Sequence, residues 1–268
     1  MLLWGQAVIL GIIQGITEYL PVSSGAHLLL AERLMFPATR SRAFDMFNTM
    51  LQFASVWVVL LFYRRQARKV FAGLMGRSPE GLRLFLNLLW AFIPTAIAGH
   101  LFGSHIKQYC DNLKFIAAAL AIGGVYIFIV VRFYRSRQRL ATLSRGQSLF
   151  IGISQSLALF PGVSRSLMTI SAGLWMGLSM SDAVEFSFLL GAGTIGAATL
   201  HQFIFNGMSL GTEFVGRAAF VCGVISAFIA SGTAMKFFIK RFSMLILSAF
   251  ACYRIALALF IFSWGLDI

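Results

Sequence analysis

Residues 5–14 read Gly-Gln-Ala-Val-Ile-Leu-Gly-Ile-Ile-Gln, and residues 146–155 read Gly-Gln-Ser-Leu-Phe-Ile-Gly-Ile-Ser-Gln. The two stretches lie 141 residues apart, and the match resumes at the same spacing with Val22-Ser23 and Val163-Ser164. Each copy is an apolar segment that runs into proline, glycine and serine. Repetition over half the length of the chain indicates that the protein is built from two related halves.

The composition around this repeat is that of a membrane protein. Of the 268 residues, 59% are hydrophobic and 12% are charged, and the mean hydropathy is +0.83. Several apolar stretches approach the ~20 residues that a helix needs to cross a bilayer, which excludes a soluble fold. The net charge of +13 is therefore interpreted as cations that orient the chain and meet anionic lipid heads, with no nucleic acid as a partner.

Six segments are predicted to span the bilayer fully, and two others are interrupted. The full spans are predicted at about 43–63, 84–103, 113–132, 183–205, 214–236 and 243–263. Residues 3–35 and 146–180 are each two shorter apolar pieces around a polar break. We interpret each as a re-entrant hairpin of two half-helices, because broken backbone is tolerated at membrane depth only when it is packed in protein or lines a wet cavity.

Lysine and arginine cluster in the loops after the first, third and fifth spans, which places all three clusters on one side, predicted to be cytoplasmic. Each half, about 1–135 and 142–268, then has one hairpin and three spans, and an odd number of spans orients the halves oppositely. The predicted fold class is an all-α polytopic membrane protein with an inverted-topology repeat, in a single membrane domain 1–268. The first hairpin enters from the outer face and the second from the cytoplasmic face, so their tips meet near the midplane.

The tip of the first hairpin gathers polar side chains that are costly to place in lipid. Glu18 lies four residues after Gln14, so the two share one helical face. His27 lies one turn after Ser24 in the second half-helix, and its imidazole is expected to reach the Ser24 hydroxyl. Gln14 and Glu18 also offer the oxygen ligands that Mg²⁺ or Ca²⁺ prefers.

The tip of the second hairpin offers a site for an anion. Ser164, Arg165, Ser166 and Thr169 lie at the N-terminus of a half-helix, where free N–H groups and the helix dipole favour negative charge. The Arg165 fork fits phosphate oxygens. Together with a hydroxyl, an imidazole and a carboxylate at the first tip, this set suits attack on a phosphoryl group. Taken singly, Ser166 or Thr169 is more often structural than catalytic, whereas Arg165 is ionisable within a hairpin and favours function.

Two further polar residues have structural interpretations that compete with functional ones. Gln14 has a repeat mate in Gln155, so a purely architectural hydrogen bond competes with a role in chemistry. Arg254 lies in the middle of the last span, where it either pairs with Glu185 or Asp45 as a structural lock or binds phosphate. The sequence leaves both alternatives open.

At these residues the chain resembles the undecaprenyl-diphosphate phosphatase family, the bacitracin-resistance type of integral membrane phosphatase. The family's first motif, E/Q-x-x-x-E followed by L-P-V-S-S-x-x-H, corresponds to residues 14–27, and its second motif, P-G-x-S-R-S-x-x-T, to residues 161–169. An E-F-S-F-L-L stretch follows at 185–190 and a Tyr-Arg motif at 253–254. Two long motifs at matching separation are a specific signal, and the resemblance runs nearly end to end.

The resemblance implies an enzyme of the bacterial inner membrane that hydrolyses undecaprenyl diphosphate to the monophosphate and so recycles the lipid carrier of cell-wall synthesis. It also implies dependence on a divalent cation, Mg²⁺ or Ca²⁺, for which Glu18 and Gln14 are the candidate ligands, and a site that faces the periplasm. Carried onto this chain, the catalytic residues are Glu18, Ser24, His27 and Arg165, with either Ser24 or His27 as the nucleophile. The residues expected to bind the substrate are Gln14, Ser23, Ser164, Ser166, Thr169 and Arg254.

The chain departs from the family pattern at three places, and Gln14 takes the neutral option of the first motif, which removes one possible charged metal ligand. These features bear on rate, metal affinity and substrate. The usual S-S-T-G-H is Ser23-Ser24-Gly25-Ala26-His27, so a hydroxyl is missing and the glycine has moved. The small pair after the second S-R-S is Leu167-Met168, and Gly191-Ala192-Gly193 stands where a proline usually follows E-F-S-F-L-L. None of these changes removes a predicted catalytic residue.

A transporter or flippase for a lipid phosphate is the alternative function, because inverted repeats with re-entrant hairpins are transporter architecture. A carrier needs the anion site but no nucleophile, so Ser24 and His27 separate the two functions. The expected partners are a polyprenyl diphosphate and the bilayer, and a homodimer stays open.

Overall fold

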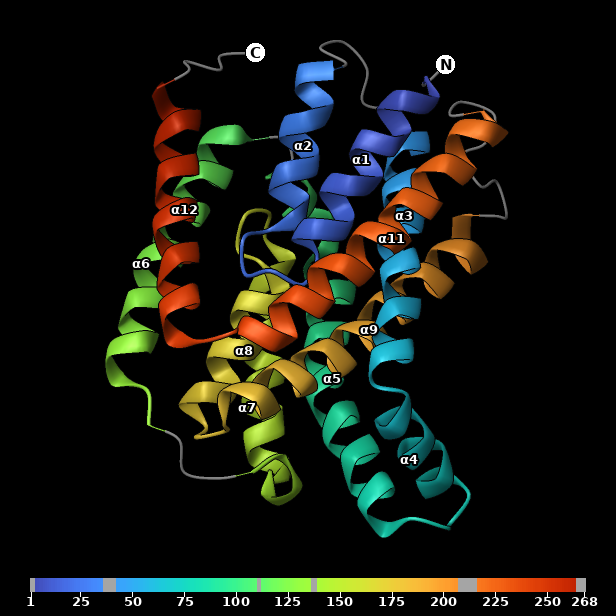
Figure 1. The fold of residues 1–268 in the computed structure, drawn as a ribbon, viewed down its shortest axis with the longest axis vertical. Coiled ribbons are helices and arrows are strands. Elements are labelled where there is room, and N and C mark those ends of the chain that lie inside the picture. The colour runs from blue at the N-terminus through green and yellow to red at the C-terminus, as the bar shows by residue number, and fades with distance from the viewer. Residues whose placement is uncertain (1–2, 36–41, 110–111, 136–138, 207–215, 264–268) are drawn as a thin grey trace.

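The computed structural model describes residues 3–35, 42–109, 112–135, 139–206 and 216–263, and within these ranges the chain is helical without a β-strand (Figure 1). The elements in chain order are α1 (Trp4–Thr17), α2 (Ser24–Met35), α3 (Arg42–Phe62), α4 (Arg64–Leu74), α5 (Pro79–Lys107), α6 (Leu113–Phe133), η1 (Leu140–Thr142), α7 (Arg145–Ser156), η2 (Leu157–Leu159), α8 (Arg165–Trp175), α9 (Met180–Asn206), α11 (Arg217–Arg241) and α12 (Met244–Ser263).

The long helices confirm the prediction of an all-α, multi-pass membrane protein. Among the described residues, α5, α6, α9, α11 and α12 are each long and apolar enough to cross a membrane. A sixth span is counted when Met46–Phe62 of α3 is taken together with α4, from which it is bent by 85°. The six predicted spans correspond to these helices.

The segment between the first two spans differs from the prediction of a loop. Its cationic residues other than Arg77 and Arg83 lie in the helix α4, and α5 begins at Pro79 rather than near residue 84. The Ser78 hydroxyl accepts the Gly81 N–H at 3.1 Å, which caps α5, and Pro79 occupies the first helical position, where its missing N–H costs nothing. Local capping chemistry therefore starts this helix before its apolar stretch begins.

The two interrupted regions are helix–break–helix units, as predicted. In Figure 1, α1 and α2 run from the upper edge of the molecule to a bend in its interior. The break between η2 and α8 lies beside this bend. Ser23 and Ser164 precede the second helix of each unit with φ of 74° and 76°, and they are the non-glycine residues with positive φ in the described ranges. Their spacing of 141 residues is that of the repeat, so both copies store the same backbone strain at the tip.

The first helix of each hairpin makes the corresponding contact in the two halves. The hairpin helix α1 packs against α11 of the other half, and α7 packs against α5. A Cβ at Gly11 would lie 2.3 Å from the Gly223 carbonyl oxygen, and one at its repeat mate Gly152 would lie 2.2 Å from the Ala91 carbonyl oxygen. Small residues thus let each hairpin approach the second span of the opposite half closely. The inverted orientation of the halves stays a prediction.

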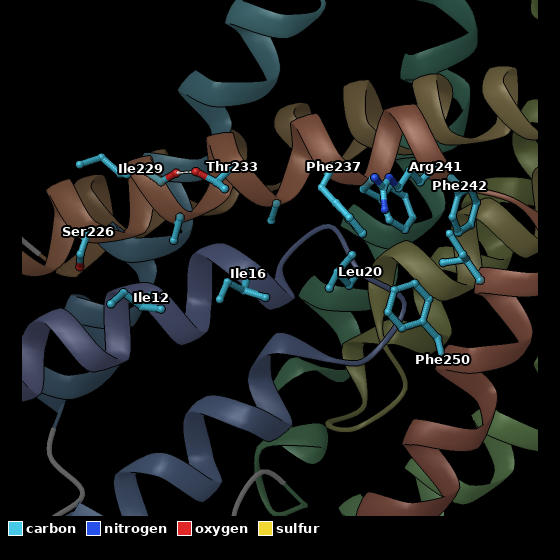
Figure 2. A pocket seen from close by; sticks show the side chains of 14 residues that line it. Ile12, Ile16, Leu20, Ser226, Ile229, Thr233, Phe237, Arg241, Phe242 and Phe250 are labelled. Carbon is cyan, nitrogen blue, oxygen red and sulfur yellow. Dashed lines mark hydrogen bonds between the residues drawn. The ribbon is translucent and has the colours of Figure 1, made fainter.

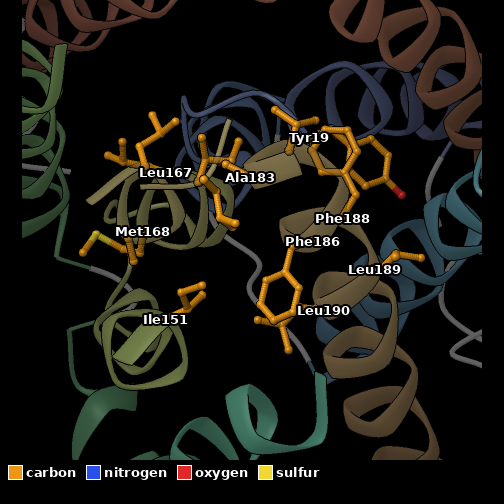
Figure 3. Packing of buried hydrophobic residues seen from close by; sticks show 14 of the residues in the cluster. Tyr19, Ile151, Leu167, Met168, Ala183, Phe186, Phe188, Leu189 and Leu190 are labelled. Carbon is orange, nitrogen blue, oxygen red and sulfur yellow. The ribbon is translucent and has the colours of Figure 1, made fainter. Parts of the chain in front are cut away.

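A buried cluster anchors the tip of the first hairpin on α9. Figure 3 shows Tyr19 beside Phe188, with ring centroids 4.8 Å apart, and Phe186 further along the same helix. The Tyr19 hydroxyl donates to the Ser55 carbonyl oxygen of α3. Phe188 of the E-F-S-F-L-L stretch therefore packs directly against the tip of the first hairpin.

Candidate active site

The two hairpin tips meet, as the sequence predicts. Ser166 Oγ at the start of α8 donates to the Leu20 carbonyl oxygen at 2.8 Å, and Arg165 Nη2 lies 3.1 Å from Glu18 Oε1. Both contacts join residues almost 150 positions apart in the chain. The carboxylate of the first tip is thereby paired with the guanidinium of the second.

Glu18 is the centre of this arrangement. Its side chain is 6% exposed, and its Oε2 atom accepts hydrogen bonds from Gln14 Nε2 at 2.5 Å and from Ser24 Oγ at 3.0 Å. The Gln14 contact comes from one turn of α1, since the two residues are four positions apart. With Arg165 on Oε1, three donors hold the carboxylate, which compensates for its burial.

His27 does not lie against Ser24, and the predicted contact between these side chains is wrong. Its Nδ1 atom is 2.7 Å from the Ser23 carbonyl oxygen and its Nε2 atom is 2.6 Å from the Tyr253 hydroxyl. Because Nδ1 faces a carbonyl, it carries the proton, and Nε2 accepts from the tyrosine. Ser24 turns instead to the Glu18 carboxylate, which is a stronger acceptor than a neutral imidazole.

The guanidinium of Arg165 is fixed between two helices. Its Nη1 atom donates to the Ser187 carbonyl oxygen of α9 at 3.1 Å while Nη2 reaches Glu18. A Cβ at Gly191 would lie 1.9 Å from Nη1, so only glycine leaves room for this guanidinium. Sequence reasoning missed both α9 residues, although Ser187 lies in the E-F-S-F-L-L stretch and Gly191 follows it.

The hydroxyls of the second tip are mostly engaged within the protein. Ser164 Oγ accepts the Leu167 N–H at 3.3 Å and lies 3.2 Å from Ser166 Oγ. Thr169 is fully buried, and its hydroxyl donates back to the Arg165 carbonyl oxygen at 2.9 Å. The structure thus places Ser164 and Ser166 at the meeting point of the tips and Thr169 behind it, in the packing between α8 and α9.

Arg254 is a clamp on both tips rather than the partner of a carboxylate. Its buried guanidinium donates to the carbonyl oxygens of Pro21 at 3.2 Å and Gly162 at 2.9 Å, and also to those of Ala119, Leu120 and Val163. The expected pairing with Glu185 is wrong, and the Asp45 side chain lies outside the described residues. Since these carbonyls surround the guanidinium, the structure favours the structural alternative for Arg254, and phosphate binding by this residue stays a prediction.

We expect Arg254→Ala to lower the melting temperature of the purified protein by roughly 10 °C. Removing the guanidinium leaves several buried carbonyl oxygens without a donor, a loss on the order of 3 kcal/mol in the free energy of unfolding. The measurement is thermal unfolding in detergent, with the exposed Arg132→Ala at the end of α6 as the control. Equal melting temperatures for the two variants would contradict the clamp.

Comparison with known proteins finds similarity over the part of the chain that contains these residues. A family model described as bacitracin resistance protein BacA matches residues 7–260, a range that holds both tips and Arg254. The chain belongs to the bacitracin resistance protein family. An undecaprenyl-diphosphatase of Sorangium cellulosum is 36% identical over 260 residues, which cover 95% of this chain and 84% of the relative. An undecaprenyl-diphosphatase 1 of Chromobacterium violaceum is 36% identical over 262 residues, 96% of this chain and 94% of the relative.

This member of the bacitracin resistance protein family has two oxygen donors that fit a divalent cation. Gln14 Oε1 is buried without a hydrogen-bond partner, and it belongs to the amide that donates to the Glu18 carboxylate. Among the described residues no group of three or more histidine, cysteine, aspartate or glutamate side chains could hold a metal. The donors present therefore suit a hard cation that takes its other ligands from water and phosphate.

Proposed function

We propose that this protein hydrolyses undecaprenyl diphosphate to undecaprenyl phosphate and phosphate where the two hairpin tips meet, and so recycles the lipid carrier of cell-wall synthesis. The observation that carries the proposal is the chain of contacts from Ser24 Oγ through the Glu18 carboxylate to Arg165. It sets a hydroxyl, a base and a phosphate-binding cation side by side. The relatives named undecaprenyl-diphosphatase support the choice of substrate.

The geometry favours Ser24 over His27 as the nucleophile. In the proposed first step Ser24 Oγ bonds to the terminal phosphorus, its proton passes to Glu18 Oε2, and undecaprenyl phosphate leaves. Arg165 and the first N–H groups of α8 stabilise the charge on the phosphoryl oxygens. Water then hydrolyses the phosphoserine and releases phosphate. His27 is directed to Tyr253 and has no contact with Ser24 Oγ.

Transport of a lipid phosphate without hydrolysis is less well supported. A carrier needs the Arg165 site, but it does not need a serine hydroxyl 3.0 Å from a buried carboxylate. The relatives' names also describe a diphosphatase rather than a carrier.

We further propose that Gln14 Oε1 and the Glu18 carboxylate hold Mg²⁺ or Ca²⁺ when substrate binds. The cation would neutralise charge on the diphosphate. The protein's own contribution is to keep the Gln14 amide turned so that its oxygen is free and its NH₂ group donates to Glu18.

The site is inferred to face the periplasm of a bacterial inner membrane. The cation-rich helix α4 lies at the end of the molecule opposite the start of α1 and the end of α12 in Figure 1. Positive residues favour the cytoplasmic side, so the first hairpin enters from the periplasmic side.

Phosphate release from undecaprenyl diphosphate by the purified protein tests the reaction, with EDTA abolishing release and Mg²⁺ or Ca²⁺ restoring it. We expect Gln14→Leu to raise the cation concentration needed for half-maximal activity at least about tenfold. Gln155→Leu is a matched control, because Gln155 is the repeat mate of Gln14 and its Oε1 atom is also buried without a partner. Its amide nitrogen contacts Thr95 of α5 and Thr194 of α9 rather than the Glu18 carboxylate. Equal cation requirements for the two variants would contradict the metal site, and no release by wild type would contradict the function.

A further inference from the structure

A long apolar groove lies outside the catalytic tips, between α1 and α11 and as far as the corner where α11 passes into α12. Its volume is about 700 Å³. Figure 2 shows Ile12 and Ile16 of α1 facing α11 across the groove, and Phe242 and Phe250 closing it at the corner. Leu20, at the tip of the first hairpin, lines the same groove.

Almost every polar group in the wall of this groove is already satisfied. Ser226 Oγ donates to the Gly223 carbonyl oxygen at 2.8 Å, and Thr233 Oγ1 donates to the Ile229 carbonyl oxygen at 3.0 Å. Arg241 is the one charged residue of the lining. The groove is therefore an apolar trough with a cation at one end.

The guanidinium of Arg241 has no anionic partner among the described residues. The guanidinium carbon lies 5.0 Å from the ring centroid of Phe237, which holds it at the end of the groove. Within the described part of the chain, no carboxylate lies within ion-pair distance of it. Its hydrogen-bond donors are thus available to a ligand.

The position of Arg241 relative to the bilayer follows from α12. The 20 residues of α12 extend about 30 Å, the thickness of the hydrocarbon core. Arg241 comes three residues before α12 begins, so it lies at one face of that core, at the level of the lipid head groups. From Ser226 to Arg241 the wall formed by α11 is about 22 Å long at ~1.5 Å per residue. This exceeds the ~15 Å of one leaflet's hydrocarbon, so an acyl chain lying obliquely along α11 fits.

We propose that this groove binds an anionic phospholipid, with its phosphate on Arg241 and one acyl chain along α11 as far as Leu20. The negative head group matches the charge of Arg241 at one end of the groove. The length of the acyl chain matches the distance from Arg241 along the wall formed by α11. The bound chain packs against the residue whose carbonyl oxygen accepts the Ser166 hydroxyl at 2.8 Å. A membrane lipid thereby supports the first tip at its contact with the second.

Native mass spectrometry of the purified protein with phosphatidylglycerol or phosphatidylcholine tests this proposal without any substrate, so its outcome is independent of the hydrolase activity. We expect one phosphatidylglycerol to be retained in preference to phosphatidylcholine. Arg241→Gln should weaken phosphatidylglycerol binding about fivefold, and Lys240→Gln should leave it unchanged, because Lys240 ends the same helix but does not line the groove.

A second variant tests the apolar part of the groove. Ala234 is partly buried and lines the wall, so Ala234→Leu should narrow the groove and reduce retention of phosphatidylglycerol while Arg241 is intact. Equal effects of Arg241→Gln and Lys240→Gln would overturn the proposal in favour of diffuse charge attraction. Unchanged retention in Ala234→Leu would overturn the placement of the acyl chain, and retention of polyprenyl phosphate but not phosphatidylglycerol would assign the groove to another lipid.

Discussion

Replacing Arg165 with lysine is expected to lower kcat/KM for undecaprenyl diphosphate by about a thousandfold. Arg165 Nη2 holds Glu18 while Nη1 holds the Ser187 carbonyl oxygen, so the planar fork connects the first tip to α9 and stays oriented for phosphate. A lysine ammonium is a compact charge on a flexible stem and does not reproduce two fixed directions. The charge is kept in this variant, so the loss reports geometry rather than net charge.

The measurement is the rate of phosphate release at several substrate concentrations. Arg145→Lys is the matched control, since Arg145 also begins a helix of the second hairpin but is exposed. Thermal unfolding of both variants separates loss of chemistry from loss of fold. More than a tenth of wild-type kcat/KM in a folded Arg165→Lys protein would contradict the role assigned to the guanidinium.

The meeting of the two tips, which brings Glu18 to Arg165, could be predicted from the sequence because a duplicated interrupted helix carries strong information. The repeat places two polar breaks at corresponding positions, and ionisable groups in lipid need partners. Glu18 at the first tip and Arg165 at the second carry opposite charges. Similarity between the halves also extends to the positive φ of Ser23 and Ser164, which a Val-Ser pair does not reveal without the backbone.

The directions of individual side chains could not be predicted, because spacing along a helix says which residues are near and not which acceptor is strongest. Ser24 and His27 are close in sequence, yet Ser24 turns to a carboxylate and His27 to Tyr253. Arg254 was predicted to find a carboxylate or a phosphate, but the carbonyl oxygens of two irregular tips already supply its acceptors. These carbonyl oxygens converge on one guanidinium only once the tips have folded, so the sequence does not reveal them as acceptors.

Replacing Ser24 with alanine is expected to reduce kcat/KM at least about a thousandfold, because no other hydroxyl donates to the Glu18 carboxylate in the described structure. Tyr253→Phe is expected to change kcat/KM less than about tenfold, since the phenol orients His27 through a single hydrogen bond at 2.6 Å. The two variants separate the two candidate nucleophiles, because removing the tyrosine hydroxyl frees His27 Nε2 and leaves Ser24 untouched.

The proposed phosphoserine intermediate can be detected directly, and a purely structural role of Ser24 would produce no such species. Rapid acid quenching of wild type with labelled substrate should leave acid-stable phosphate on the peptide that contains Ser24, and Ser24→Ala should leave none. Phosphohistidine is labile in acid, so a label that survives only in alkali and disappears in His27→Ala would assign attack to the imidazole. Glu18→Gln should retain the hydroxyl but slow the appearance of the label, because the Ser24 proton then has no carboxylate to accept it. Complete loss of the label in Ser24→Ala and slower labelling in Glu18→Gln are both expected because Ser24 Oγ lies 3.0 Å from Glu18 Oε2.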